Sequence, residues 1–360
     1  MFHKIQEAVR LLNHDYMQSF TVNAESRAQD LQKISSYLEE KCQQDGTEFV
    51  YGRGRRKSKN QKYLELFQRF RERQVTYNWH TASFQGRNNY CKTDPDATFM
   101  HMKDDHMRNA QLKPGYNIQI GIDSEYIVSA DVFQDRNDVW TLVPFLKMMD
   151  EKLGFRYPSV TADSGYESEE GYTYLRSSGQ KPYIKPKTYE KWKKRSFKQD
   201  ISKRENMGYD KETDTYTCHA GKKLKALFVK KQKSKSGYES EVTVYECDGC
   251  TYCPHKEKCT RAKGNKRLYI SKSFLEKRQE SYENILSETG IQYRMNRSIQ
   301  VEGAFGVLKN DYEFQRFLLR GKTKVKLEIL LLCMGYNLNK LHAKIQKGRT
   351  RTYLFEVQSA

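Results

Sequence analysis

The chain has 360 residues, enough for two average domains or one large elaborated domain. Its 64 Lys and Arg against 45 Asp and Glu give a formal net charge of +19, which favours a polyanionic partner, nucleic acid ahead of acidic lipid. The 25 Tyr and 17 Phe exclude a disordered chain, and no apolar run reaches the roughly 18 residues that a membrane span needs. Residues 1–18 lack the apolar core of a signal peptide, so a cytosolic protein is expected.

Residues 1–90 are predicted to form a helical region. Apolar residues recur at three- and four-residue spacing, as in Ile5, Val9 and Leu12. The segment GRGRRKSK interrupts this pattern and predicts a basic loop. The loop is either a solvated surface or a contact to DNA phosphates, for which charge and flexibility suffice. Its basic residues are Arg53, Arg55, Arg56, Lys57 and Lys59.

Residues 91–179 have the order of an α/β domain. The runs YNIQIGID and EYIVSADVF predict a pair of strands, and VWTLVPFLKMMDEKLG predicts a helix. A short apolar run, residues 158–162, then leads directly into Asp163. An Asp at the end of a strand usually caps a turn, but it also lies where a substrate can reach it.

Residues 180–270 are rich in Lys and predict an insertion that carries a cysteine cluster. Cysteines at Cys-x2-Cys spacing in a reducing compartment indicate a metal site, and structural zinc is favoured. An iron–sulfur cluster and free thiols are the alternatives. His255, beside the cluster, is expected at the surface rather than as a ligand. The favoured ligands are Cys218, Cys250, Cys253 and Cys259, with Cys247 as a spare or substitute.

Residues 271–360 are predicted to form C-terminal helices, because helical periodicity runs from Phe274 to Ile345 with few breaks. Glu302 and Lys309 are seven residues apart, almost two turns of an α-helix, so they are expected on one face. A solvated face with surface ion pairs is the simpler interpretation of this pattern.

Four segments together resemble bacterial insertion-sequence transposases of the DDE superfamily. Tyr293, Arg297, Glu302 and Lys309 resemble the Tyr-Arg-Glu-Lys signature, although its commonest form has one residue fewer on each side of the Arg. TADSGYESEEGY resembles the segment with the second catalytic Asp, and KTDPDATFM with PGYNIQIGID resembles the preceding block. Two further segments, CDGCTYCPHKEKCTRAKGNKR and RGKTKVKLEILLLCMGYNLNKL, complete the resemblance in the same order, so that it covers roughly residues 90 to 345.

The resemblance implies a metal-dependent DNA strand-transfer site. Two Mg²⁺ or Mn²⁺ ions would be held by Asp, Asp and Glu, of which Asp163 and Glu302 are the second and third. The side chains of Tyr293, Arg297 and Lys309 would hold DNA phosphates. The family's first Asp lies on an early strand in an Asp-Gly-Thr context, whereas Asp45-Gly46-Thr47 follows a polar helix end and is expected to be a decoy. Asp94 and Asp123 are the other candidates for the carboxylate that would take the place of the family's first Asp.

The expected protein is therefore an α/β protein with an RNase H-like core that lacks its first strand, a helical N-terminal region, a zinc-ribbon-like insertion and a helical C-terminus. Its expected function is that of a truncated, catalytically impaired transposase that binds double-stranded DNA at transposon ends and target, with a homodimer as one fitting assembly. It would be cytoplasmic and associated with the bacterial nucleoid. The alternatives are a fully competent enzyme and a non-catalytic regulator that competes for transposon ends.

Overall fold

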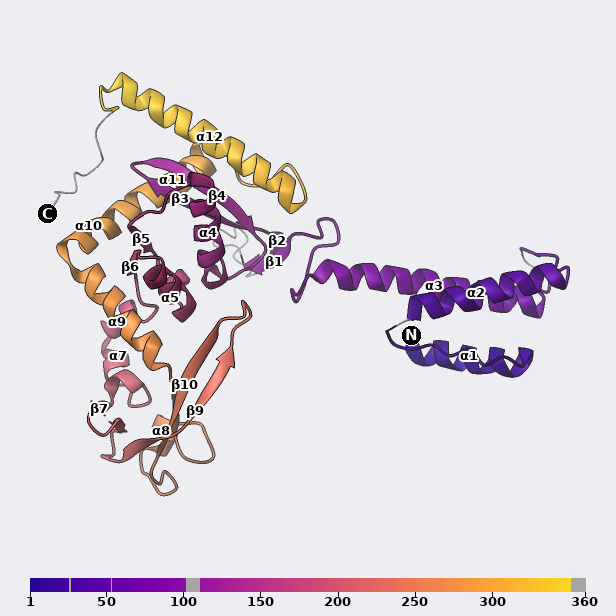
Figure 1. Cartoon of the computed structure of the whole chain (residues 1–360), viewed down its shortest axis with the longest axis horizontal. Helices are drawn as coiled ribbons and strands as arrows, with labels where there is room; N and C mark the ends of the chain where they lie inside the picture. Colours follow the sequence, from indigo (N-terminus) through magenta and orange to yellow (C-terminus); the bar gives the residue numbers. More distant parts are fainter. Residues whose placement is uncertain (26, 53, 102–110, 351–360) are drawn as a thin grey trace. The chain divides into compact units, whose positions relative to one another are not determined.

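The computed structural model describes residues 1–25, 27–52, 54–101 and 111–350. The chain divides into two compact units, Met1–Pro95 and Asp96–Ala360, most of whose helices and strands are labelled in Figure 1. No helix in these ranges has the length and apolar character to cross a bilayer.

The first unit consists of three helices, as the periodicity of residues 1–90 predicts. They are α1 (Phe2–Tyr16), α2 (Arg27–Gln44) and α3 (Lys59–Phe84). The Ser58 side chain accepts a hydrogen bond from the Gln61 N–H and caps the start of α3. The apolar faces meet in a core where Ile5, Leu12 and Phe67 are fully buried. This core is formed by residues of the first unit alone.

The second unit begins with two hairpins. The first joins β1 (Thr98–His101) to β2 (Leu112–Gly115), and the second joins β3 (Asn117–Asp123) to β4 (Tyr126–Phe133). In the second hairpin Asn117 pairs with Phe133 and Asp123 with Tyr126. Its turn residues Ser124 and Glu125 both have positive φ, as a tight two-residue hairpin turn requires.

The next segment forms a parallel strand pair covered by helices. The strands are β5 (Ser159–Ala162) and β6 (Lys181–Ile184), and the helices are α4 (Leu142–Leu153) and α5 (Glu169–Ser177). Phe145, Leu175 and Ile184 pack together in the core between them. The predicted strand–strand–helix–strand order is confirmed.

Among the described residues the strands lie in four separate sheets, three of two strands and one of five, rather than in one continuous sheet. In the described part of the chain β3 pairs only with β4, and β5 only with β6. The mixed α/β character of the chain is confirmed. Both β3 and β5 therefore keep one edge without a strand partner among these residues.

The insertion is a five-stranded antiparallel sheet, ordered β11-β10-β9-β8-β7. Three short helices, α6 (Tyr189–Trp192), α7 (Arg195–Lys198) and α8 (Lys256–Cys259), lie along the same stretch of chain. The strands are β7 (Gly208–Asp210), β8 (Thr215–Thr217), β9 (Lys223–Lys233), β10 (Glu239–Cys247) and β11 (Arg267–Ile270).

The C-terminal region is helical, with two stretches of π-helix. A helix α9 (Lys272–Leu286) precedes α10 (Glu288–Arg297), which continues as a π-helix over Ser298–Glu302. The short α11 (Gly303–Gly306) follows, then a second π-helix over Val307–Asp311. After an irregular segment the long α12 (Lys322–Gln346) completes the unit.

Helix α12 packs on the β3–β4 hairpin. Val325, Ile329 and Tyr336 of α12 are buried in the same core as Val132. The Asn337 side chain donates to the Ile127 carbonyl at 2.8 Å and accepts from the Ile127 N–H at 2.9 Å. These contacts fix the helix along β4.

The hairpin turn is tied to the far end of α12 by charge. Glu125 lies 3.0 Å from the buried Lys344 and 3.5 Å from Lys340.

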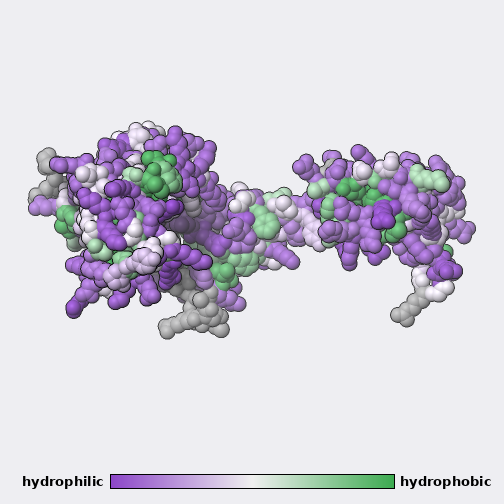
Figure 2. All heavy atoms as spheres, turned by 90° about the horizontal axis from the view of Figure 1, so that it is seen from below, coloured by the Kyte–Doolittle hydropathy of each residue, from purple (hydrophilic) through white to green (hydrophobic). Residues whose placement is uncertain are grey.

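Hydrophilic residues cover most of the face shown in Figure 2, in keeping with the high net charge.

Candidate functional site

Asp163 and Arg297 form an ion pair that joins two distant segments. Asp163 follows β5, and its Oδ1 accepts a hydrogen bond from the Gly165 N–H at 2.7 Å, as a turn-capping Asp does. Its Oδ2 lies 3.3 Å from Nη2 of Arg297 at the end of α10. The Asp163 side chain is 42% exposed, so it borders solvent.

A second carboxylate, that of Asp138, lies next to this pair. Asp138 Oδ1 accepts hydrogen bonds from the side-chain amides of Asn117 at 2.8 Å and Gln119 at 3.3 Å. Both amides come from the same face of β3, because successive side chains of a strand alternate between faces. The sequence prediction missed Asp138. The polar residues at alternating positions of β3 were the available signal.

Gly165 is the point where the two carboxylates meet. A Cβ atom on Gly165 would lie 2.9 Å from Oδ1 of Asp163 and 3.0 Å from Oδ2 of Asp138. The first separation is shorter than real Cβ contacts and the second is tighter than most of them, so a side chain at this position would require one carboxylate or both to shift. Glycine leaves room for both carboxylates as they are placed here.

Tyr166 is hydrogen-bonded to Gln119, the same side chain that donates to Asp138. Its hydroxyl donates to the side-chain carbonyl of the buried Gln119. Burial raises the pKa of Tyr166, and the negative charges of Asp138 and Asp163 raise it further, against a smaller lowering by Arg297. The phenol is thus a neutral hydrogen-bond donor at ordinary pH.

The π-helix explains the longer spacing between Arg297 and Glu302. In a π-helix hydrogen bonds connect residues five apart, so such residues lie one turn apart, as residues four apart do in an α-helix. Arg297 and Glu302 bound this stretch and are five residues apart. The additional residue is therefore absorbed by the wider turn, and the two side chains share one side of the helix.

The second π-helix changes the position of Lys309 relative to Glu302, and Tyr293 packs against a strand. The seven-residue step from Glu302 to Lys309 enters the second π-helix, so it covers less than the two α-helical turns expected. The Tyr293 ring packs edge-on against Tyr183 of β6, with centroids 5.0 Å apart. The Glu302 side chain is exposed and makes no hydrogen bond or ion pair within the described ranges.

The three other candidate carboxylates lie elsewhere. Asp45 is bound to Lys41 and Asn60 in the first unit, as a residue at a helix end. Asp94 also belongs to the first unit. Asp123 is exposed at the opposite end of β3 from Asn117, about 20 Å along the strand.

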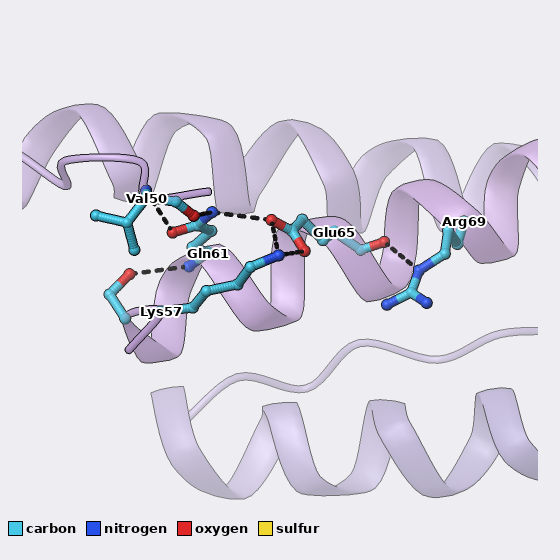
Figure 3. A network of polar contacts seen from close by, with 6 residues as sticks. Val50, Lys57, Gln61, Glu65 and Arg69 are labelled. Atoms are coloured by element: carbon cyan, nitrogen blue, oxygen red, sulfur yellow. Dashed lines mark hydrogen bonds and ion pairs between the residues drawn. The ribbon is translucent and has the colours of Figure 1, made fainter. Parts of the chain in front are cut away.

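Two lysines of the basic loop are engaged in ion pairs. Lys57 Nζ lies 2.6 Å from Glu65, which also accepts from Gln61, in the network of Figure 3. Lys59 Nζ lies 2.8 Å from Asp15. Arg55 and Arg56 are exposed. Arg53 lies outside the described residues.

The five clustered cysteines line one small cavity in the insertion. They come from the end of β8, the end of β10, the loop after it and α8, and are Cys218, Cys247, Cys250, Cys253 and Cys259. The Lys266 backbone N–H lies 3.4 Å from the Cys250 sulfur, as a donor to it. His255, expected at the surface, also lines the cavity, with its ring 5.0 Å from that of His219.

The thiols of the cavity influence one another. Burial, followed by the neighbouring Cys250 and Cys218 thiols, raises the pKa of Cys247 to about 12. Burial also raises the pKa of Cys259. As placed, the described His, Cys, Asp and Glu side chains form no group of three or more that could hold a metal ion.

Residues 217–342 match the family model described as "Transposase DDE domain". This span contains the cysteine cavity, Arg297 and Glu302, whereas Asp163 precedes it. Comparison with curated proteins gave no match, and comparison with solved structures gave none either.

Proposed function

The chain is a transposase of the DDE superfamily, and from this premise we propose that it binds double-stranded transposon ends and that its strand-cleavage centre is built on Asp163 and Glu302. The observation that carries the proposal is the Arg297–Asp163 ion pair, which spans 134 residues. It joins the two motifs that the resemblance assigns to one site. Tyr293, Arg297 and Lys309 would then bind the phosphates of the DNA end.

DDE transposases generally use Mg²⁺ or Mn²⁺, which prefer carboxylate oxygens. Asp163 and Glu302 supply that donor type, and such ions would activate the attacking hydroxyl. The donor set is incomplete as placed, because neither Asp163 nor Glu302 belongs to a group of three or more His, Cys, Asp or Glu side chains that could hold a metal ion in the described ranges. We therefore propose that strand cleavage by this chain is impaired.

An RNase H-like core fits the same proposal. The β3–β4 and β5–β6 pairs are separate, yet Tyr166 of the β5 segment donates to Gln119 of β3. The two pairs thus face each other across a polar contact rather than through a strand ladder. Positioning dominates phosphoryl transfer, so a loosened core lowers the rate by orders of magnitude.

A nicking assay tests the proposal. The wild-type chain and Glu302→Ala are incubated with Mg²⁺ or Mn²⁺ and a supercoiled plasmid that carries the DNA flanking this gene. We expect binding without metal-dependent nicking. Nicking by the wild-type chain that disappears in Glu302→Ala would show a competent centre, and Asp138→Asn should then be examined first, because Asp138 is the carboxylate beside Asp163.

DNA binding itself is expected to rest on distributed charge. Affinity should fall steeply with salt, because phosphate contacts release counterions. The Arg55→Ala/Arg56→Ala variant should weaken binding and reduce the slope of log K against log salt by about 1 to 2. The matched control is the Arg156→Ala/Arg176→Ala variant, because these two arginines already form ion pairs with Asp150 and Glu276. Equal losses in both variants would argue against a specific role for the loop.

The non-catalytic regulator is the second candidate, and the incomplete donor set favours it. As placed, the described His, Cys, Asp and Glu side chains form no group of three or more on which a catalytic ion would depend. A regulator would compete with an active transposase for the ends. Competition by both the wild-type chain and Glu302→Ala, with equal potency, would support this role over the enzymatic one.

We also propose that the cysteine cavity holds a structural zinc ion. The shared cavity and the backbone N–H donated to Cys250 support this proposal, since thiolate ligands accept such hydrogen bonds. The ligands would be Cys218, Cys250, Cys253 and Cys259, with Cys247 as the alternative. Their thiol groups would have to move closer together to bind one ion.

Metal analysis of freshly reduced protein tests the zinc proposal. About one zinc per chain is expected. The ion should be lost in Cys250→Ser and retained in Cys333→Ser, a buried cysteine of α12. Iron in place of zinc would indicate a cluster, and no metal in either protein would mean that these cysteines are free thiols.

A further inference from the structure

Helix α12 has a second apolar face that the described residues of the second unit leave exposed. One face is buried on the β3–β4 hairpin through Val325, Ile329 and Tyr336. The side chains of the other face are between 39% and 60% exposed. They are Leu327, Leu330, Leu331, Met334, Leu338, Leu341 and Ile345. A contiguous exposed apolar surface of this kind marks an interaction site.

Six of these residues follow the spacing of a coiled-coil seam. They are separated by steps of four, three, four, three and four residues, which is the a/d pattern of a heptad repeat. The seam runs from Leu327 to Ile345, about 27 Å along the helix. A groove beside it, lined by Leu330, Leu338 and Leu341, extends the apolar surface toward β4.

We propose that this seam pairs with the same helix of a second copy of the chain, antiparallel, about a two-fold axis near Tyr336. Such an interface is self-complementary, because each seam residue meets a seam residue of the other copy. Leu327 would pack on Ile345 of the other copy, Leu331 on Leu341, and Met334 on Leu338. A single apolar seam is thus sufficient for both subunits.

Residues beside the seam favour a second copy in the antiparallel direction. Glu328 would lie next to His342 of the other copy, an acceptor beside a donor. The Glu328 carboxylate is already held in place by the Leu318 and Leu319 backbone N–H groups, at 2.9 and 3.1 Å. Parallel helices would place Glu328 beside Thr323 instead.

Gly335 lies at the centre of the antiparallel arrangement. A Cβ atom at this position would have no neighbour within 4 Å, so the helix surface there is open. Small residues let two helices approach closely, and Gly335 would face Gly335 of the other copy across the axis. Repulsion between two chains that each carry a net charge of +19 opposes this pairing, and salt screens the repulsion.

Analytical ultracentrifugation of the full chain tests the pairing. We expect a dimer that strengthens between about 0.1 and 0.5 M salt, as charge repulsion is screened. Leu331→Glu/Leu338→Glu should be monomeric with an unchanged circular dichroism spectrum. The control Leu227→Glu, an exposed Leu of β9, should remain dimeric. A wild-type chain that is monomeric throughout, or a dimer that the double variant retains, would overturn the proposal.

Disulfide trapping tests the direction of the helices. A mixture of Leu331→Cys and Leu341→Cys proteins should form a mixed disulfide dimer above the background of the native cysteines. Leu331→Cys alone should not form one. A disulfide dimer of Leu331→Cys alone would show parallel helices and contradict the antiparallel pairing.

Discussion

Arg297 and Asp163 are 134 residues apart in the chain, and their charged groups are 3.3 Å apart in space. The pair joins the end of α10 to the end of β5, where the sequence places the two motifs of the proposed cleavage centre. Four predictions test how this unit is held together.

The Arg297–Asp163 pair should contribute little to stability. Its side chains are 23% and 42% exposed, and ion pairs of this kind are screened by water. Arg297→Ala should lower the free energy of unfolding by less than about 1 kcal/mol, measured by urea denaturation. A loss several times larger would mean that the pair is a structural contact rather than part of a binding surface.

The Arg278–Glu167 pair should behave in the opposite way. Glu167 is 2% exposed and Arg278 is 11% exposed, with the charged groups 2.8 Å apart. Arg278→Ala leaves a buried carboxylate without its ion-pair partner, although the Lys187 N–H still donates to it, and should cost about 3 kcal/mol in the same measurement. Arg176→Ala is the control, because its pair with Glu276 is solvent-exposed. Similar losses in both variants would contradict the prediction.

The Glu125 cluster predicts a pH dependence of stability. Burial alone would raise the pKa of Glu125, but Lys344 and Lys340 outweigh it and hold the pKa below the ordinary value of 4.5. Because the pKa is lowered by folding, this stabilisation is present above pH 4.5 and is lost as the pH falls through the folded-state pKa.

Glu125→Gln should therefore destabilise the fold at neutral pH, by about 3 kcal/mol. The difference from the wild type should shrink as the pH falls below 4.5, because the wild-type carboxyl then becomes neutral as well. Urea denaturation at neutral and acidic pH gives both values. A difference that is independent of pH would assign the loss to packing instead.

Gly165→Ala should disturb the two carboxylates at the site. The new methyl group would lie about 3 Å from both Asp163 and Asp138, so we expect a loss of about 1 to 3 kcal/mol in unfolding free energy. Gly264→Ala, where a Cβ meets nothing within 4 Å, should be nearly neutral. Equal stability of both variants would show that the carboxylates move apart freely.

The helices and the β3–β4 hairpin could be predicted from periodicity, because each has one buried and one exposed face. The five-stranded sheet of the insertion could not. In β9 only Leu224 is buried, so the alternation that identifies a strand is missing from Lys223–Lys233. The sequence suggested an insertion there, and the sheet depends on pairing that local pattern does not encode.

Part of the polar cluster around Asp163 could be predicted from the sequence. Asp163 and Arg297 were placed in one site by the resemblance, since no local signal connects residues so distant in sequence. The extra residue between Arg297 and Glu302 was visible, but its accommodation in a π-helix depends on backbone hydrogen bonds. Asp138 was missed because its role comes from amides contributed by β3 and from its closeness to Gly165.

The Asn337 side chain also determines where the β3–β4 sheet can grow. Its amide satisfies both backbone groups of Ile127 on the outer edge of β4, as a neighbouring strand would. Exposed sheet edges recruit other strands, and an occupied edge does not. A further extended segment would therefore have to displace Asn337 in order to pair with Ile127, whereas the outer edge of β3 has no strand partner among the described residues.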